Sequence, residues 1–148
     1  GLPGIRSGLG AGDTALIGRL RAFRNVAGPP VPGPLLAASA ALWGDAAHVE
    51  ATSEAYQQKM AAAERILGQR MTRPGGGFFL WLDVGNGEDF ARRAWGEQGV
   101  RVLPGAYMGR NFDDGKTQEN PGFSYVRVAL VNDLSTILTA LERLRGIL

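Results

Sequence analysis

The sequence predicts an α/β domain with an α+β-like layout: a sheet of three or slightly more strands, covered by helices. Three observations predict this fold class. From residue 45 onward the periodic segments follow the order helix, strand, helix, strand, strand, helix, which suits a small sheet with helices on one face. Two strongly apolar runs, 78–84 and 123–131, have strand-like composition. The chain has 148 residues, 45% of them hydrophobic, which is enough for one buried core.

The first 44 residues predict two helices joined by a proline-rich elbow. Asp13 can cap a helix that Gly28 and the following two prolines stop. The apolar residues of this helix recur at helical spacing: Leu16, Ile17, Leu20, Phe23 and Val26. After the elbow at 29–34, the almost wholly apolar segment 35–43 predicts a second helix, buried on most sides and ended by Gly44.

The middle of the chain predicts a long helix, a strand and a short helix. Asp45 can cap the long helix, which extends to about Arg70 and carries one apolar stripe: Val49, Tyr56, Met60, Ala63 and Leu67. After the break at 74–77, residues 78–84 predict a strand buried on at least one face. The short helix spans about 88–98, with Gly99 as its cap and three inner residues: Phe90, Ala94 and Trp95.

The last third predicts two strands and a closing helix. A strand at 100–103 leads into a polar, glycine-rich connection at 104–122. In the strand 123–131, alternation places Phe123, Tyr125, Arg127 and Ala129 on one face and Ser124, Val126, Val128 and Leu130 on the other. Asp133 caps the final helix, with inner residues Leu134, Ile137, Leu138, Leu141 and Leu144. A charge in such a strand needs a partner, so Arg127 should meet either an anionic ligand or an internal carboxylate.

Composition narrows the function classes. The formal net charge is only +2, and the 16 Lys and Arg residues are mixed with acidic ones, so no basic stripe of the nucleic-acid-binding kind is present. The absence of cysteine excludes disulfides and thiolate metal sites. There is no secretory-type apolar start and no run of about 18 apolar residues, so we expect a soluble cytoplasmic protein with no membrane partner.

Four segments carry a family resemblance. The segment Leu2-Pro-Gly-Ile-Arg-Ser-Gly8 and the strand Tyr125-Val-Arg-Val-Ala-Leu130, which follows Asn120-Pro-Gly122, resemble motifs of the fold-type-I, class I and II aminotransferases that depend on pyridoxal 5'-phosphate (PLP). Segments 74–81 and 100–105 match two small-domain strands of that family in order and spacing. The motifs at 24–25, 29–34, 43–45 and 76–81 are most similar to the succinyldiaminopimelate aminotransferases of lysine biosynthesis.

The resemblance implies a cofactor, two site residues and a reaction. Arg6 would hold the PLP phosphate, and Arg127 would bind the substrate α-carboxylate. The reaction would transfer an amino group between an amino acid, such as N-succinyldiaminopimelate, and 2-oxoglutarate. Residues 1–44 would end the large cofactor-binding domain and form the hinge, 45–148 would form the small C-terminal domain, and the enzyme would be a homodimer.

The resemblance also implies that the catalytic residues lie elsewhere. The Schiff-base lysine is expected upstream of Gly1, and the two lysines present, Lys59 and Lys116, lack its sequence context. We therefore expect no catalytic residue and no metal site in this chain, and no transamination by the chain alone.

Other interpretations of the same residues stay open. The chain could be a stand-alone, non-catalytic module that binds a carboxylate or a protein partner, or part of a PLP lyase of the same fold. Taken without its motif, Arg6 is a surface or turn arginine. His48 is a residue of a helix start, and Tyr107 either borders the substrate or packs in its loop. If the resemblance holds, residues 1 to about 40 are removed here from the large domain and should expose apolar surface, which predicts association or segment swapping between chains. The residues concerned are Leu35, Leu36, Leu42 and Trp43.

Overall fold

The computed structural model describes residues 3–28, 31–111 and 120–148. The chain divides into two compact units, Gly1–Thr52 and Ser53–Leu148, with the boundary inside helix α3 (Ala46–Leu67). None of the helices in these described ranges is long and apolar enough to cross a membrane.

The first unit contains the short 3-10 turn η1 (Pro3–Ile5), helix α1 (Thr14–Ala27), helix α2 (Gly33–Trp43) and the start of α3. Both predicted helices are confirmed, and Asp13 caps α1 by accepting hydrogen bonds from the N–H groups of Ala15 and Leu16, each at 3.0 Å. The predicted burial of 35–43 is wrong, since Ser39 is the one buried side chain among the residues described in this unit. An apolar helix is buried only where another element covers it, and Trp43 remains 64% exposed.

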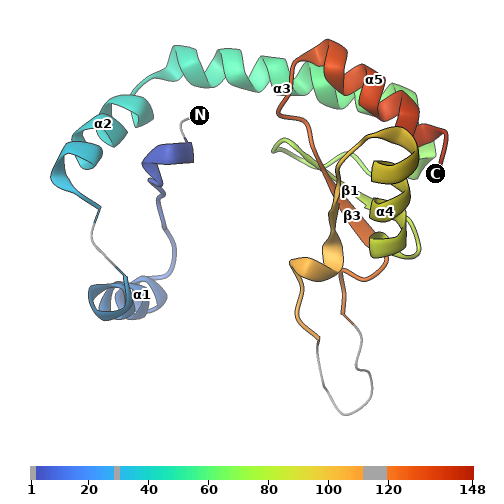
Figure 1. The fold of residues 1–148 in the computed structure, drawn as a ribbon. Helices are drawn as coiled ribbons and strands as arrows, with labels where there is room; N and C mark the ends of the chain where they lie inside the picture. The colour runs from blue at the N-terminus through green and yellow to red at the C-terminus, as the bar shows by residue number, and fades with distance from the viewer. Residues whose placement is uncertain (1–2, 29–30, 112–119) are drawn as a thin grey trace. The chain divides into compact units, whose positions relative to one another are not determined.

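The second unit is built on a three-stranded sheet in the order β1-β3-β2. Figure 1 labels the paired strands β1 and β3. The strands are β1 (Phe79–Asp83), β2 (Leu103–Pro104) and β3 (Tyr125–Ala129), and both outer strands run antiparallel to β3. The predicted strand at 100–103 is shorter than expected. The reason is local: the Val100 N–H donates to the Ala94 carbonyl at 2.9 Å, so this end of the segment closes the preceding helix instead of joining the sheet.

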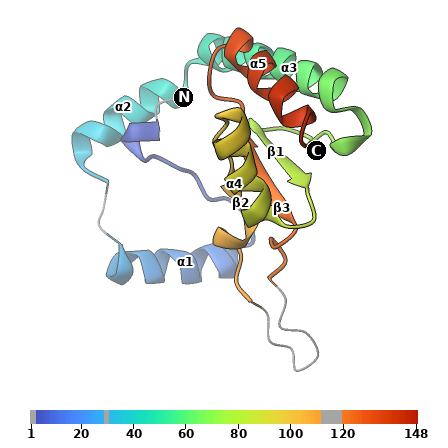
Figure 2. The same ribbon diagram turned by 45° about the vertical axis from the view of Figure 1, so that its right-hand side comes forward.

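Helices α3, α4 (Gly87–Gln98) and α5 (Leu134–Arg145) cover one face of the sheet (Figures 1 and 2). The core between them is apolar and almost fully buried: Met60, Ala63, Leu67, Leu80, Leu82, Phe90, Ala94, Val126, Val128, Leu130, Ile137, Leu141 and Leu144. This arrangement confirms the predicted α/β fold class of a small sheet covered by helices. The predicted alternation in the last strand is also confirmed, because Val126, Val128 and Leu130 are buried whereas Arg127 is half-buried.

The predicted burial is wrong for two residues that the sequence places on the inner faces of their helices. Trp95 is 56% exposed because it follows the buried Ala94 by one position, which places it about 100° further round the helix, at the edge of the apolar stripe. The Arg101 guanidinium lies over its ring, 4.8 Å from the centroid. Leu134 is 38% exposed, in the first turn of α5.

The predicted helix caps are confirmed. Asp133 Oδ1 accepts from the N–H of Thr136 at 2.9 Å, and Asp45 Oδ1 accepts from the N–H of His48 at 3.0 Å. Gly99 ends α4 in the left-handed conformation (φ 65°), which glycine adopts without steric cost. The half-buried His48 therefore occupies the first turn of α3, as the sequence indicated.

Candidate functional site: the open face of the sheet

One face of the sheet is not covered by α3, α4 and α5, and it carries the predicted ligand arginine. Among its residues are Phe79 and Trp81 on β1 and Tyr125 and Arg127 on β3, which alternate with the buried core residues of the same strands. We call these four residues the open face. None of them is fully buried, and Trp81 is 44% exposed.

Strand register explains how the open-face side chains meet. Trp81 stands directly opposite Arg127, and Phe79 stands opposite Ala129. Each large side chain leans toward its diagonal neighbour, which is within reach of long and aromatic side chains. The Trp81 and Tyr125 rings stack with centroids 5.4 Å apart and planes 15° apart, and Arg127 Cζ lies over the Phe79 ring, 4.3 Å from its centroid.

The charge on Arg127 has an aromatic neighbour and no acidic one among the residues that the structure describes. Within them, no carboxylate oxygen lies within 4.0 Å of its guanidinium, and none of its N–H donors makes a hydrogen bond. Asp83 lies on the same face of β1 as Trp81, two residues further along the strand. Its carboxylate accepts a hydrogen bond from the Gly85 N–H at 3.1 Å. Of the two partners that the sequence left open for Arg127, the internal carboxylate is absent from the described residues.

A row of aromatic rings continues from Phe79 to α3. Phe79 contacts Phe78 (centroids 4.3 Å apart), and Phe78 stacks on Tyr56 at 5.2 Å. Lys59 lies over the Tyr56 ring at 4.9 Å and donates a hydrogen bond to the Leu130 carbonyl at 3.1 Å. Lys59 is therefore held by structural contacts, while Lys116 lies outside the described residues.

Next to Trp81, at the border of the open face, the backbone at Gly105 lies very close to the backbone at Gly122. A Cβ added at Gly105, in the turn η3 (Gly105–Tyr107), would lie 2.5 Å from the Gly122 carbonyl oxygen and 2.8 Å from Cη2 of Trp81. The Asn120 side chain ties the same two segments together, donating to the Ala106 carbonyl at 2.9 Å and accepting from the Gly122 N–H at 2.9 Å. Two glycines and one asparagine thus fix the backbone beside Trp81. Tyr107 is 65% exposed.

The second predicted site residue, Arg6, belongs to the first unit. It follows η1, is exposed, and has a left-handed backbone conformation (φ 56°), which is uncommon for a residue other than glycine. Strained backbone of this kind persists only where neighbouring structure holds it, and it is frequent at ligand sites. The next residue is anchored, since Trp43 Nε1 donates to Ser7 Oγ at 3.3 Å.

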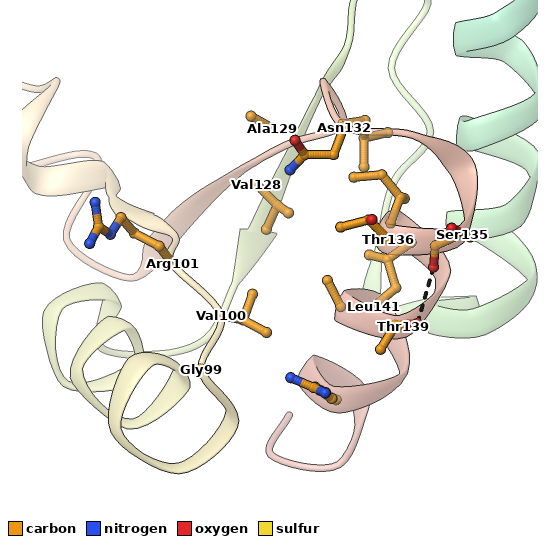
Figure 3. Close-up of a pocket in the computed structure, with 14 residues that line it drawn as sticks. Gly99, Val100, Arg101, Val128, Ala129, Asn132, Ser135, Thr136, Thr139 and Leu141 are labelled. Carbon is orange, nitrogen blue, oxygen red and sulfur yellow. Dashed lines mark hydrogen bonds between the residues drawn. The ribbon is translucent and has the colours of Figure 1, made fainter.

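A hollow of about 490 Å³ lies elsewhere in the second unit, between residues 99–101, the end of β3 and α5 (Figure 3). Its hydroxyl groups already have partners: Ser135 and Thr136 donate to the Asp133 carboxylate at 2.6 and 2.7 Å, and Thr139 donates to the Ser135 carbonyl at 3.1 Å. Arg101 points away from its centre in Figure 3. Because the hollow contains none of the predicted site residues and its hydroxyls bond within the fold, the open face is the better candidate. The described residues also contain no group of three or more His, Asp or Glu side chains able to hold a metal ion.

Comparison with protein families decides the affiliation of the chain. The family model "Aminotransferase class I and II" matches residues 1–144. The chain belongs to this family. The family predicted from the sequence motifs is therefore confirmed.

Among class I and II aminotransferases, curated and solved relatives match nearly the whole chain. A 4-dedimethylamino-4-oxo-anhydrotetracycline transaminase of Streptomyces rimosus is 36% identical over 146 residues, which are 97% of this chain and 38% of the relative. An aminotransferase structure from Neisseria meningitidis is 36% identical, with a TM-score of 0.79 over 99% of this chain and 37% of its own. A probable N-succinyldiaminopimelate aminotransferase of Thermus thermophilus is 26% identical, with a TM-score of 0.66 over 93% of this chain and 36% of its own. The chain thus spans less than two fifths of the length of these relatives.

Proposed function

We propose that this chain forms the C-terminal part of a PLP-dependent aminotransferase, which transfers an amino group between an amino acid and a 2-oxo acid such as 2-oxoglutarate. Family membership supports the reaction class. The observation that carries the proposal for this chain is Arg127, a half-buried cation on the open face without a carboxylate partner among the described residues. A substrate carboxylate would supply the missing negative charge.

Arg127 is proposed to bind the substrate α-carboxylate. A guanidinium presents N–H donors in a planar fork that matches two carboxylate oxygens, which a lysine cannot reproduce. Hydrogen bonds to charged groups contribute about 1.5–3 kcal/mol each, so a two-pronged contact would strongly favour amino and 2-oxo acids over uncharged analogues. Binding through the carboxylate fixes one end of the substrate and thereby orients its α-carbon.

Arg6 is proposed to hold the phosphate of PLP, the cofactor that serves as the electron sink in amino-group transfer when bound. The residue type fits a phosphate, because Arg6 is an exposed arginine and a guanidinium can donate to two phosphate oxygens at once. The unusual φ of Arg6 and the anchoring of Ser7 by Trp43 would fix the backbone from which the guanidinium reaches the phosphate. An Arg6→Gln variant of the complete polypeptide should release PLP more readily in equilibrium dialysis.

The proposal also covers the amino donor, the oligomeric state of the enzyme and the division of this chain between two domains. We propose N-succinyldiaminopimelate as the amino donor, which would place the enzyme in lysine biosynthesis; the likeness to the Thermus thermophilus protein supports this choice. We also propose a homodimer, with residues 1–44 ending the large domain and 45–148 forming the small one.

The test is amino transfer by the complete polypeptide loaded with PLP. Glutamate formed from 2-oxoglutarate is measured with a panel of amino donors that includes N-succinyl-LL-diaminopimelate. We expect glutamate with at least one donor, and no turnover by the 148-residue chain alone, assayed in parallel with PLP. Absence of glutamate with every donor would contradict the proposed reaction class, and turnover by the chain alone would contradict the expected position of the catalytic lysine.

A further inference from the structure

The guanidinium of Arg127 lies against an aromatic ring, a contact that takes up none of its hydrogen-bond donors. Its Cζ lies 4.3 Å from the centroid of the Phe79 ring, and among the described residues the guanidinium has no hydrogen-bond acceptor. An aromatic face attracts a cation through its quadrupole and takes up none of the five N–H donors. A carboxylate in the same place would occupy those donors, and a substrate would first have to displace it.

Phe79 owes this contact to the strand register. The residue opposite Phe79 is Ala129, whose methyl side chain leaves space above the sheet. Arg127 is the diagonal neighbour of Phe79, and its long side chain reaches over that space. Its direct neighbour Trp81 stacks instead on Tyr125, so Phe79 is the ring that lies against the Arg127 guanidinium among the described residues.

The Phe79 ring is itself supported from behind. Phe78 lies 4.3 Å from it and stacks on Tyr56, which α3 supplies. The same part of α3 is fixed to the core through the buried Met60 and Ala63, and through Lys59, which donates to the Leu130 carbonyl. The row of rings therefore connects Arg127, through Tyr56 and α3, to the buried core of the second unit.

From this geometry we propose that Phe79 is a positioning residue for substrate binding: its ring holds the Arg127 guanidinium in place while leaving the N–H donors open to a carboxylate. The inference rests on the proposed function of Arg127 and adds a role for Phe79, which acts through Arg127. The contact with Phe79 explains how the half-buried Arg127 guanidinium can lack a carboxylate partner among the described residues. It also predicts that Phe79 affects the binding of charged ligands more than that of neutral ones.

The experiment compares variants of the complete polypeptide loaded with PLP. Phe79→Leu removes the aromatic face at similar volume, Phe79→Tyr keeps it, and Trp95→Leu removes the exposed ring under Arg101 as a matched control. The dissociation constants of glutarate and of its neutral diamide, glutaramide, are measured by calorimetry, and KM and kcat for the amino donor are measured separately. Far-UV circular dichroism checks folding, and Phe79→Met takes the place of Phe79→Leu if that variant does not fold.

We expect Phe79→Leu to raise the Kd of glutarate and the KM of the donor by about 2- to 30-fold, the range for losing a cation–π contact, with a smaller change in kcat. Glutaramide binding should not change, and Phe79→Tyr and Trp95→Leu should behave like the wild type. Glutarate binding by Phe79→Leu at wild-type strength, or equal losses in Phe79→Leu and Phe79→Tyr, would overturn the role of the ring. The proposed function fails separately, if Arg127→Lys leaves both glutarate binding and donor KM unchanged.

Discussion

Gly105→Ala should destabilise the second unit, because the new methyl group has no room. Its Cβ would lie 2.5 Å from the Gly122 carbonyl oxygen and 2.8 Å from Trp81 Cη2, whereas real Cβ atoms essentially never approach within 3.0 Å. The backbone at 105 or 122 must therefore move by at least half an ångström, the difference between 2.5 and 3.0 Å. Overpacking of this kind costs about 1–3 kcal/mol in the free energy of unfolding.

Gly96→Ala is the matched control for Gly105→Ala. Gly96 lies inside α4, and a Cβ there would meet nothing within 4 Å. Alanine in a helix interior is favoured over glycine, so this variant should gain about 0.5–1 kcal/mol. The same chemical change should therefore have opposite signs at two sites of one unit.

Urea unfolding of the 148-residue chain measures both variants. Far-UV circular dichroism follows the helices, and near-UV circular dichroism follows the aromatic groups, including the Trp81–Tyr125 stack. We expect the denaturation midpoint to fall for Gly105→Ala and to rise or stay constant for Gly96→Ala, with unchanged m-values. Equal shifts in the two variants would refute the close approach of Gly105 to Gly122 and Trp81.

Two further predictions concern stability. Leu82→Ala, at a fully buried core position, should lower the free energy of unfolding by about 2–5 kcal/mol. Val131→Ala, at a position that is 55% exposed, should change it by no more than about 0.5 kcal/mol. Comparable urea midpoints for the two variants would contradict the described core. The pKa of Asp133 lies well below its usual range, because its carboxylate accepts hydrogen bonds from the Ser135 hydroxyl and from the N–H and hydroxyl of Thr136. A depressed pKa stabilises the folded state at pH values above the unfolded-state pKa of about 3.9, and this contribution is lost as the pH falls toward the folded-state pKa. The difference in unfolding free energy between wild type and Asp133→Asn should therefore be constant near neutrality and shrink below about pH 4. A difference that stays constant down to pH 2.5 would contradict this titration.

The elements and caps of this fold follow from local chemistry, which is why the sequence predicts them. Asp13, Asp45 and Asp133 each precede an apolar pattern of helical period, and a carboxylate at that position satisfies N–H groups that the helix leaves unpaired. The two faces of β3 follow from the strand period of two in the same way. These are properties of neighbouring residues, and no tertiary information is needed to see them.

Burial and pairing depend on distant residues, and there the sequence was less informative. An apolar pattern cannot distinguish the centre of a helix stripe from its edge, so it predicts Trp95 inside the core although this side chain is exposed. Likewise, the apolar segment 35–43 indicates a helix but not whether another element covers it. The contact between Phe79 and Arg127 could not be predicted, because it depends on the register that places Ala129 opposite Phe79.

The most direct test of the account is the effect of Arg127→Gln on kcat/KM for the amino donor, in the complete polypeptide loaded with PLP. Arg101→Gln is the control, because Arg101 is an exposed arginine of the same unit that also lies over an aromatic ring. If Arg127 binds the α-carboxylate through two charged hydrogen bonds, its replacement should lower kcat/KM by at least about 100-fold, while Arg101→Gln stays within about twofold of wild type. Equal activity of the Arg127→Gln variant and the wild type would contradict the assignment of the open face as the substrate-binding surface.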